Sequence, residues 1–333
     1  MPTIRDVARK AGVSVATVSR VINNKGKIAD DTKKTVLEAI DELSYKPNIV
    51  ARGLSTRRSY AVAFILPTIT NPFFPEMAKA VEDVARENGY KVLLCNTDDR
   101  RDILKDYLHT LGSQYIDGII INSLNLVKED LEELSQMGIP VVMMDRVLED
   151  QNFTSITVNN REGGRMATEH LLDVGCKRVA HISGLETDFN AQYRLWGYRD
   201  IVSEKPWFDP SWIGQAEFSV QSGYEVAKEI FTRHNDVDGI FCSNDLIAIG
   251  ALKAASEWGK SVPNDLAIVG FDGIDMSGLT IPGITTIQQP VYYMGELAMK
   301  ELLKKIEEKD AEAKHYELGV ELVLRESTMR PRE

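Results

Sequence analysis

The sequence is poor in cysteine and histidine. Its 333 residues include three cysteines, Cys95, Cys176 and Cys242, which lie far apart and form no CxxC pair. The five histidines are scattered and pair with no obvious nucleophile. Disulfide frameworks, metal sites and redox motifs are therefore disfavoured. We expect three buried free thiols in a reducing cytoplasm.

Long hydrophobic runs and catalytic motifs are also missing. No apolar run reaches the roughly 18 residues of a membrane span, and the start, MPTIRDVARKAG, has no apolar signal segment. GxxxxGK[ST], HExxH and GxSxG do not occur. The pair Gly163–Gly164 could open an anion-binding helix, but such pairs are weak indicators. We therefore expect a cytoplasmic protein that is not an enzyme, needs no cofactor or metal and meets no membrane.

Charge is distributed unevenly along the chain. The formal net charge is −11, yet residues 1–58 contain 12 Lys/Arg against 6 Asp/Glu. The remaining chain contains 27 Lys/Arg against 44 Asp/Glu. Its length suggests two or three structural units. A basic head on an acidic body predicts that only the head binds a polyanion, although a small solvated domain with extra lysines would look similar.

The head carries three short helical patterns. Apolar residues recur at helical spacing in 4–11 and in 15–22, and Gly12 with Ser14 marks a tight turn between them. A third helix is predicted over 30–45. Two helices joined in this way form a helix-turn-helix, and the third completes a small core.

The second helix of this head has the side chains of a DNA reader. Arg20 can donate two hydrogen bonds to guanine, and Val15 and Ala16 can contact a thymine methyl group. Because helix-turn-helix patterns alone give false positives, the flanking sequence matters. The motif DVAxxAGVSxxTVSRVIN, followed by PNxVARxL, closely resembles the lac-repressor family of bacterial regulators.

The resemblance implies which head residues contact DNA. Val15, Ala16 and Arg20 match the base-reading positions, and Thr17 and Ser19 match phosphate contacts. Because the first two are apolar, the operator sequence cannot be transferred from a relative. Residues 47–59 match a hinge helix whose leucine enters the minor groove. The full predicted set is Thr3, Ser14, Val15, Ala16, Thr17, Ser19, Arg20, Asn23, Asn48, Ala51 and Leu54. Linker packing is the alternative role for Leu54.

The body shows apolar strands alternating with helical stretches. Such alternation predicts α/β sheets of parallel strands, covered on both faces. The predicted strands are 61–67, 91–96, 118–122, 140–145, 179–184, 239–245 and 266–272. Ligands of these folds bind beyond the carboxyl ends of the strands.

Aromatic, carboxylate, amide and arginine side chains follow these strands. Rings can cover the C–H face of a sugar, and the polar groups can bind its hydroxyls. The predicted ligand-binding set is Asn71, Phe73, Phe74, Asp145, Arg146, Arg194, Phe218, Asn244, Asp272 and Gln289. Asp245 and Phe271 lie at the same strand ends. Structural roles stay open: the phenylalanines could be core, Asp145–Arg146 a local ion pair, and Asp245 or Asp272 a helix cap.

For the body, the family resemblance implies a two-lobed fold like that of periplasmic sugar-binding proteins. The expected division is a headpiece over 1–46, a hinge and linker over 47–59, and a body over 60–333. One lobe would combine roughly 60–160 with 290–320, and the other 161–289 with 321–333. NPFF, DR, RLWGY, EFS, SND, GFD and the glutamine of QQP match ribose-binding proteins. Ribose, or a close furanose, is therefore the leading effector.

Several functional alternatives stay open at this stage. The effector could be another sugar, a purine or a phosphorylated co-repressor, and a partner protein could also act as co-effector. A periplasmic-type receptor would share the body but not the head. The resemblance implies double-stranded palindromic operator DNA as partner and a two-fold protein to read it. The resemblance implies that tetramers of the family use an extra C-terminal heptad segment. The tail ELGVELVLRESTMRPRE has no such leucine heptads, so we expect a homodimer.

Overall fold

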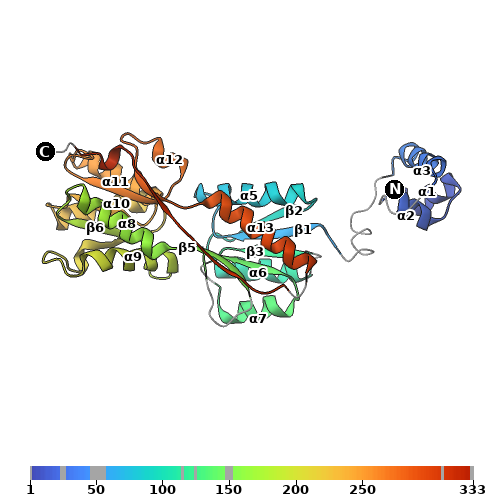
Figure 1. Ribbon diagram of the computed structural model, residues 1–333, viewed down its shortest axis with the longest axis horizontal. Helices are drawn as coiled ribbons and strands as arrows, with labels where there is room; N and C mark the ends of the chain where they lie inside the picture. The colour runs from blue at the N-terminus through green and yellow to red at the C-terminus, as the bar shows by residue number, and fades with distance from the viewer. Residues whose placement is uncertain are drawn as a thin grey trace. The chain divides into compact units, whose positions relative to one another are not determined.

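The computed structural model describes residues 2–22, 28–45, 58–113, 116–123, 126–146, 153–308 and 311–330. The chain divides into two compact units, Met1–Ser59 and Tyr60–Glu333, drawn in Figure 1. Each unit has its own hydrophobic core. They are described separately below.

The first unit contains the three predicted helices, α1 (Ile4–Ala11), α2 (Val15–Ile22) and α3 (Asp30–Glu42). The Asp6 carboxylate accepts hydrogen bonds from the Thr3 backbone N–H (2.8 Å) and hydroxyl (2.7 Å), which fixes the start of α1. Gly12 ends that helix with a left-handed φ of 66°. The buried valines of the three helices meet in one small core. The helix-turn-helix prediction is therefore confirmed.

The second unit begins with a parallel six-stranded sheet in the order β11-β5-β4-β3-β1-β2. Helices α5 (Phe73–Glu87) and α13 (Val291–Glu307) cover one face, and α6 (Arg101–Ser113) and α7 (Lys128–Gln136) cover the other (Figure 1). Its strands are β1 (Ala61–Leu66), β2 (Lys91–Asn96), β3 (Gly118–Ile121), β4 (Val141–Met144), β5 (Thr154–Val158) and β11 (His315–Leu318). We call this sheet and its helices lobe 1.

Strand β1 shows why the central strands of lobe 1, β1, β3 and β4, are continuously apolar. Successive side chains point to opposite faces, so Phe64 packs with the core under α5 and α13. Its neighbour Ile65 packs with the core under α6 and α7. Because both faces are covered, neither set can be polar.

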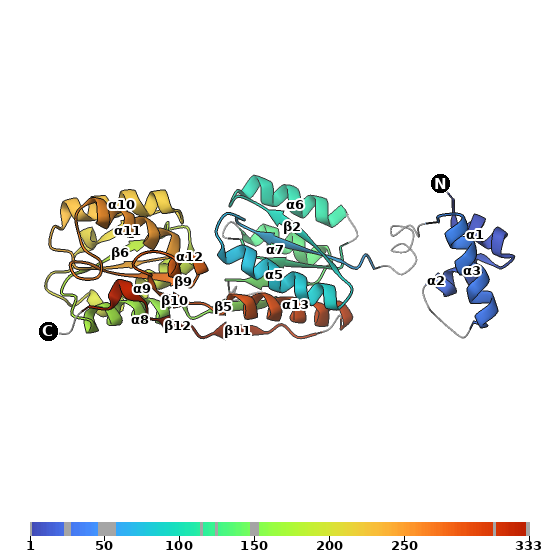
Figure 2. The same ribbon diagram turned by 90° about the horizontal axis from the view of Figure 1, so that it is seen from above.

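A second six-stranded sheet follows in the order β12-β10-β9-β8-β6-β7. Helices α8 (Asn160–Asp173) and α9 (Phe189–Val202) cover one face, and α10 (Val220–Arg233) and α11 (Asp245–Glu257) the other (Figure 2). Its strands are β6 (Val179–Ser183), β7 (Ile213–Gln215), β8 (Gly239–Cys242), β9 (Ala267–Asp272), β10 (Thr285–Gln288) and β12 (Glu321–Val323). We call it lobe 2. One pair, β10 with β12, is antiparallel, and the other strand pairs of this sheet are parallel, in agreement with the predicted α/β architecture.

The chain passes between the two lobes three times. It crosses from β5 to α8, returns from β10 to α13, and crosses again between β11 and β12. Lobe 1 therefore receives its edge strand β11 from the end of the sequence, and lobe 2 receives β12. Neither lobe is continuous along the chain.

Glycines bring α8 and α9 into backbone contact. A Cβ atom on Gly164 would lie 2.2 Å from the carbonyl oxygen of Arg194. A Cβ atom on Gly197 would lie 2.1 Å from the carbonyl oxygen of Arg161. Side chains larger than glycine would push the helices apart, so these two residues set the position of α9 in lobe 2.

No helix in the described part of the chain has the length and hydrophobicity of a membrane span. The three cysteines are buried and free, as predicted. Burial raises the pKa of the Cys95 thiol to about 11, which leaves it protonated and unreactive at neutral pH.

Candidate functional site

A cavity of about 480 Å³ lies in the second unit and is lined by residues of both lobes. This volume is within the range of roughly 300–1,000 Å³ that small-molecule sites occupy. The lining loops follow the carboxyl ends of β1, β2, β3 and β4 in lobe 1, and of β6, β7, β9 and β10 in lobe 2. Strand ends therefore assemble the site, in the manner expected for parallel sheets.

Most of the predicted ligand-binding residues meet at this cavity. Eight of them line it: Asn71, Phe73, Phe74, Asp145, Arg194, Phe218, Asp272 and Gln289. Arg146 and Asn244 are not among the lining residues.

Arg146 is engaged beside the cavity rather than in its wall. Its Nη1 donates to the carbonyl oxygen of Leu126 (2.7 Å), and its guanidinium carbon lies 4.7 Å from the ring centroid of Phe189. The local ion pair with Asp145 does not form; instead, the Asp145 carboxylate accepts from the Asn122 amide at 2.6 Å. Arg146 thus joins lobe 1 to α9 of lobe 2.

The end of β8 places two neighbouring polar residues in different roles. Asn244 caps α11, because its Oδ1 accepts from the Ile247 N–H at 2.9 Å. The Oδ2 of Asp245 accepts from the N–H groups of Gly273 (2.9 Å) and Ile274 (2.8 Å). Asp245 is therefore a structural tie between α11 and the turn after β9. It neither caps α11 nor lines the cavity.

Three phenylalanines supply the aromatic walls. Phe73 and Phe74 contact each other edge to face, with ring centroids 5.1 Å apart. Phe73 is 4% exposed and belongs to the core under α5, so it is both a core residue and part of the wall. Phe218 lines the cavity from lobe 2. Its ring packs against Gly184, where a Cβ atom would lie only 2.8 Å from the ring.

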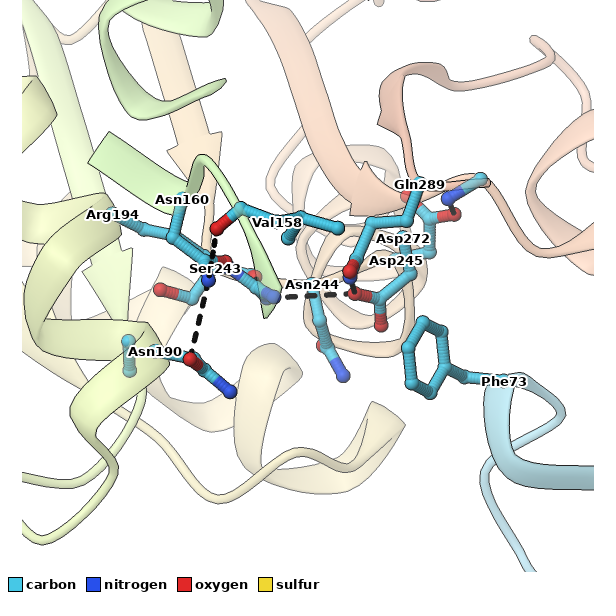
Figure 3. A network of polar contacts seen from close by, with 12 residues as sticks. Phe73, Val158, Asn160, Asn190, Arg194, Ser243, Asn244, Asp245, Asp272 and Gln289 are labelled. Atoms are coloured by element: carbon cyan, nitrogen blue, oxygen red, sulfur yellow. Dashed lines mark hydrogen bonds and ion pairs between the residues drawn. The ribbon is translucent and has the colours of Figure 1, made fainter. Parts of the chain in front are cut away.

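Arg194 is the centre of the polar wall (Figure 3). Its Nη1 donates to the carbonyl of Ser243 (2.6 Å) and lies 3.4 Å from Asp272 Oδ1. Its guanidinium carbon lies 3.7 Å from the centroid of the Phe271 ring, which supports it from behind. Gln289 donates to the same Asp272 oxygen at 2.8 Å.

The cavity is rich in carboxylates. Six carboxylates line it together with Arg194: Asp98, Asp99, Asp145, Asp188, Glu217 and Asp272. Burial raises the pKa of Asp272 to about 7, against the opposing effect of Arg194, and raises the pKa of Asp145 to about 6. Burial exceeds the effect of a single ion pair because the desolvated carboxylate loses all its water. Such a site favours neutral ligands whose hydroxyls donate to carboxylates, and it repels anions.

Backbone strain coincides with the same carboxylates. Asp98, Asp99, Asp145 and Asp272 have φ values of 48°, 52°, 58° and 106°. These lie in or beyond the left-handed region that L-residues rarely adopt, although aspartate tolerates it better than most. Strained backbone often collects at functional sites, where it aims side chains that regular structure could not.

The sequence prediction missed several lining residues. Asp98 and Asp99 follow the predicted strand 91–96, and Asn122 ends the predicted strand 118–122, so the strand-end rule that selected Asp145 would have found them too. Asp188 and Asn190 lie at the start of α9, where the Asp188 carboxylate accepts from the Asn190 N–H at 2.9 Å. In the sequence, Asp188 and Asn190 indicate only the start of a helix, and nothing there distinguishes a helix cap from a ligand-binding residue.

The headpiece presents the predicted base-reading residues at its surface. Val15, Ala16 and Arg20 are exposed on α2. The Ser14 hydroxyl accepts from the Thr17 N–H at 3.1 Å and so caps this helix. Thr3 and Ser14 are exposed, while Thr17 and Ser19 are half-buried. The remaining predicted DNA contacts lie outside the described residues: Asn23, Asn48, Ala51 and Leu54.

The raised pKa of Asp272 predicts a pH dependence of stability. A carboxyl pKa near 7 means that the folded state binds this proton more tightly than the unfolded state, so stability is lost as pH rises through 7. Between pH 5.5 and 8 the ligand-free protein should lose roughly 1–2 kcal/mol through this group, or a few °C of thermal midpoint. Asp272→Asn keeps the acceptor but cannot ionise, so its melting curves should shift less. An equal shift in both proteins would contradict the assignment.

A three-helix DNA-reading headpiece joined to a two-lobed body with a polar and aromatic cavity defines a ligand-responsive DNA-binding protein. Comparison with known families agrees. Residues 3–48 match the model for bacterial regulatory proteins of the lacI family. Residues 59–323 match the model for periplasmic binding proteins and the sugar-binding domain of the LacI family. The chain belongs to the lacI family of bacterial transcriptional regulators.

Individual relatives cover almost the whole chain. It is 42% identical over 328 residues to the ribose operon repressor of Halalkalibacterium halodurans, covering 98% of this chain and 97% of that protein. A lac repressor dimer bound to operator and the anti-inducer ONPF is 27% identical, with a TM-score of 0.87 over 98% of this chain and 99% of that one. A periplasmic binding protein/LacI transcriptional regulator from Alkaliphilus metalliredigens, complexed with D-xylulofuranose, is 32% identical, with a TM-score of 0.71 over 81% of this chain and 99% of that one. The prediction that the chain is not an enzyme agrees with these regulators.

Proposed function

We propose that the protein is a homodimeric repressor of a palindromic operator and that a neutral furanose sugar, ribose in the first place, binds its cavity and releases it from DNA. The observation that carries this is the lining of the cavity. Phenylalanine rings from both lobes flank a wall of carboxylates, amides and one arginine. That combination suits a small polyhydroxyl molecule with an apolar face.

Two polar atoms at the site lack a protein partner. Within the described chain, Gln289 Oε1 and Asn244 Nδ2 are buried and make no hydrogen bond. A buried acceptor and a buried donor without partners each cost free energy, and a ligand hydroxyl can satisfy either one. Asn244 thereby keeps a proposed ligand contact, although in this structure it lies behind the cavity wall.

The charge of the site argues against the phosphorylated co-repressor. A sugar phosphate would bring a charge of roughly −1.5 to −2 close to six carboxylates and a single arginine. A purine base could stack on Phe73 and Phe74, but it offers few hydroxyls to the carboxylates. The similarity to a ribose operon repressor and to a regulator complexed with a furanose points in the same direction.

The coupling between sugar and DNA follows from the two lobes. A ligand that contacts both lobes prefers one arrangement of them, and this preference is transmitted to the start of the body, where the chain joins the hinge. We propose that the protein binds the operator without sugar and releases it when sugar binds. We therefore expect the protein to act in the cytoplasm, where the chromosome lies.

Calorimetry on the full chain tests the effector. Ribose should bind, 2-deoxyribose more weakly because it lacks one hydroxyl, and ribose 5-phosphate not at all. A palindromic operator selected from a randomised DNA pool should be released by ribose in a gel-shift assay. If the protein bound a purine or another sugar and not ribose, the assignment of ribose as effector would be wrong. If ribose tightened operator binding, it would be a co-repressor and not an inducer. If release from the operator needed a second protein, that protein would be a co-effector.

Replacing Arg20 with alanine should abolish operator selectivity. Arg20 is the only long polar side chain among the proposed base-reading residues, and a two-bond contact to guanine is worth roughly 1–3 kcal/mol. Affinity for the selected operator should fall about tenfold or more at fixed salt, while affinity for random DNA changes little. Equal losses on both DNAs would show a phosphate contact only. Sugar binding, measured in parallel, serves as the control for folding.

A further inference from the structure

Asn160 lies where the chain first crosses from lobe 1 to lobe 2. Strand β5 ends at Val158 and α8 begins at Asn160, with only Asn159 between them. The backbone N–H of Asn159 donates to the carbonyl of Leu318 at the end of β11 (3.0 Å). Its side-chain oxygen accepts from the N–H of Glu162 in α8 (3.0 Å). The crossing is thus anchored in both lobes within three residues.

The side chain of Asn160 is 4% exposed, and chemistry fixes its orientation. The Nε of Arg194 lies 2.8 Å from Asn160 Oδ1, and because arginine can only donate, the oxygen must face it. The amide nitrogen therefore donates to Asn190 Oδ1 (3.1 Å) and to the carbonyl of Val158 (3.3 Å). Figure 3 shows Asn160 between Val158 on the crossing and Asn190 beside it.

These bonds decide what two cavity residues offer to a ligand. The side-chain oxygen of Asn190 is occupied by Asn160, so its amide N–H groups are left for the cavity. Arg194 uses Nε on Asn160 and Nη1 on Ser243, which leaves Nη2. Both residues line the cavity. This side of the site therefore presents donors, and it suits ligand oxygens that accept, opposite the accepting carboxylates.

We propose that Asn160 is a positioning residue that ties the inter-lobe crossing to the ligand-facing donors of Arg194 and Asn190. When the lobes rotate, the backbone at the crossing turns and carries the Asn160 amide with it. A ligand held by Arg194 and Asn190 restrains the same amide and, through it, the crossing. The inference rests on the proposed function, because it assigns the route by which that ligand biases the lobes.

Two variants of the full chain separate the bonds from the packing. Asn160→Leu keeps a similar volume and removes every side-chain hydrogen bond. It should weaken ribose binding at least tenfold and reduce the factor by which saturating ribose lowers affinity for the selected operator. Operator affinity without ribose should stay within twofold of wild type. Asn160→Asp keeps the acceptor for Arg194 and loses the donor, so its ribose affinity should fall at least threefold and less than that of Asn160→Leu.

A readout without ligand tests the link to Arg194 directly. The charged groups around Asp272 are Arg194 on α9, Asp245 on α11 and Asp145 after β4, and Arg194 is the one that favours the charged carboxylate. If Asn160 holds Arg194 in place, Asn160→Leu should lose more thermal stability between pH 5.5 and 8 than wild type. If Asn160 had only a structural role, Asn160→Leu would lower the melting temperature by the same amount at pH 5.5 and at pH 8.

The outcomes distinguish this inference from the proposed function. If wild type ignores ribose, the proposed effector is wrong, and the pH comparison alone decides on Asn160. A steeper pH dependence then supports its role, and an unchanged one overturns it. If wild type binds ribose but Asn160→Leu keeps its affinity, its release factor and its pH dependence, the inference fails. Should Asn160→Leu not fold, unchanged ribose affinity and release in Asn160→Asp would overturn it.

Discussion

Replacing Arg194 with alanine is expected to weaken ribose binding about 100-fold or more. Arg194 is buried, and its Nη2 carries the two N–H groups left for the ligand. The loss of two charge-assisted hydrogen bonds from these groups to ribose costs roughly 3 kcal/mol or more. Arg194→Lys should lose most of that affinity as well, because its three donors sit on one nitrogen, whereas Arg194 reaches Asn160 from Nε and Ser243 from Nη1 of a planar fork. Titration calorimetry of the purified full chain measures both.

The loss of Arg194 should also change how stability responds to pH. Its removal leaves Asp272 buried without a cation, and a carboxyl group in that position takes up a proton rather than remain charged. Arg194→Ala should therefore melt closer to wild type at pH 5.5 than at pH 8. Arg199→Ala, which removes an exposed arginine from the same helix, is the matched control and should leave ribose affinity within twofold. Ribose affinity of Arg194→Ala within threefold of wild type would place the ligand elsewhere.

The second large effect is expected in the interface between α8 and α9. Gly164→Ala should destabilise the protein by roughly 3 kcal/mol or more, because the new methyl group would meet a backbone carbonyl that cannot rotate away. This exceeds the gain of roughly 1 kcal/mol that alanine brings to a helix interior. The thermal midpoint should fall by about 10 °C. Since the carbonyl belongs to Arg194, ribose affinity should fall with it.

Gly112→Ala is the matched control for the glycine prediction. Gly112 also lies within a helix, α6, but its added methyl group would meet the flexible end of Met137 at 3.1 Å. That side chain can move, so the helix propensity gain should dominate and the midpoint should stay or rise. If Gly164→Ala behaves like Gly112→Ala, α8 and α9 are not held at backbone contact.

Most of the strands that the sequence revealed are buried on both faces; the exception is β2, a largely exposed edge strand that its apolar run VLLC revealed. Residues 61–67, 118–122 and 266–272 are continuously apolar because helices cover each side of the sheet, and the structure contains strands at all three places. Strands β7, β11 and β12 escaped prediction because they are three or four residues long and lie at sheet edges, where HYEL and ELV need little hydrophobicity. Strand β5, TSITV, alternates polar and apolar residues and resembled a loop.

The candidate site was predictable to the extent that strand ends determine it. What the sequence could not show is which of two adjacent residues reaches the cavity. In FCSND, the helix starts at Asp245, so Asn244 becomes its cap and Asp245 turns toward the backbone after β9. A shift of one residue would exchange the two roles. Asn160 was invisible for another reason: its partners Asn190 and Arg194 lie 30 and 34 residues away, and only packing brings them together.

The order in which the chain leaves the ribosome has a consequence for regulation. The headpiece is complete once α3 has emerged, whereas lobe 1 waits for β11 and lobe 2 for β12, near the end of translation. At about 5–20 residues per second, the interval is on the order of 15–55 s. A growing chain therefore displays a folded headpiece well before either lobe can close. A chain cut short before His315 lacks an edge strand in both lobes. Such a fragment should be cleared by proteases rather than persist as a DNA binder that ignores its effector.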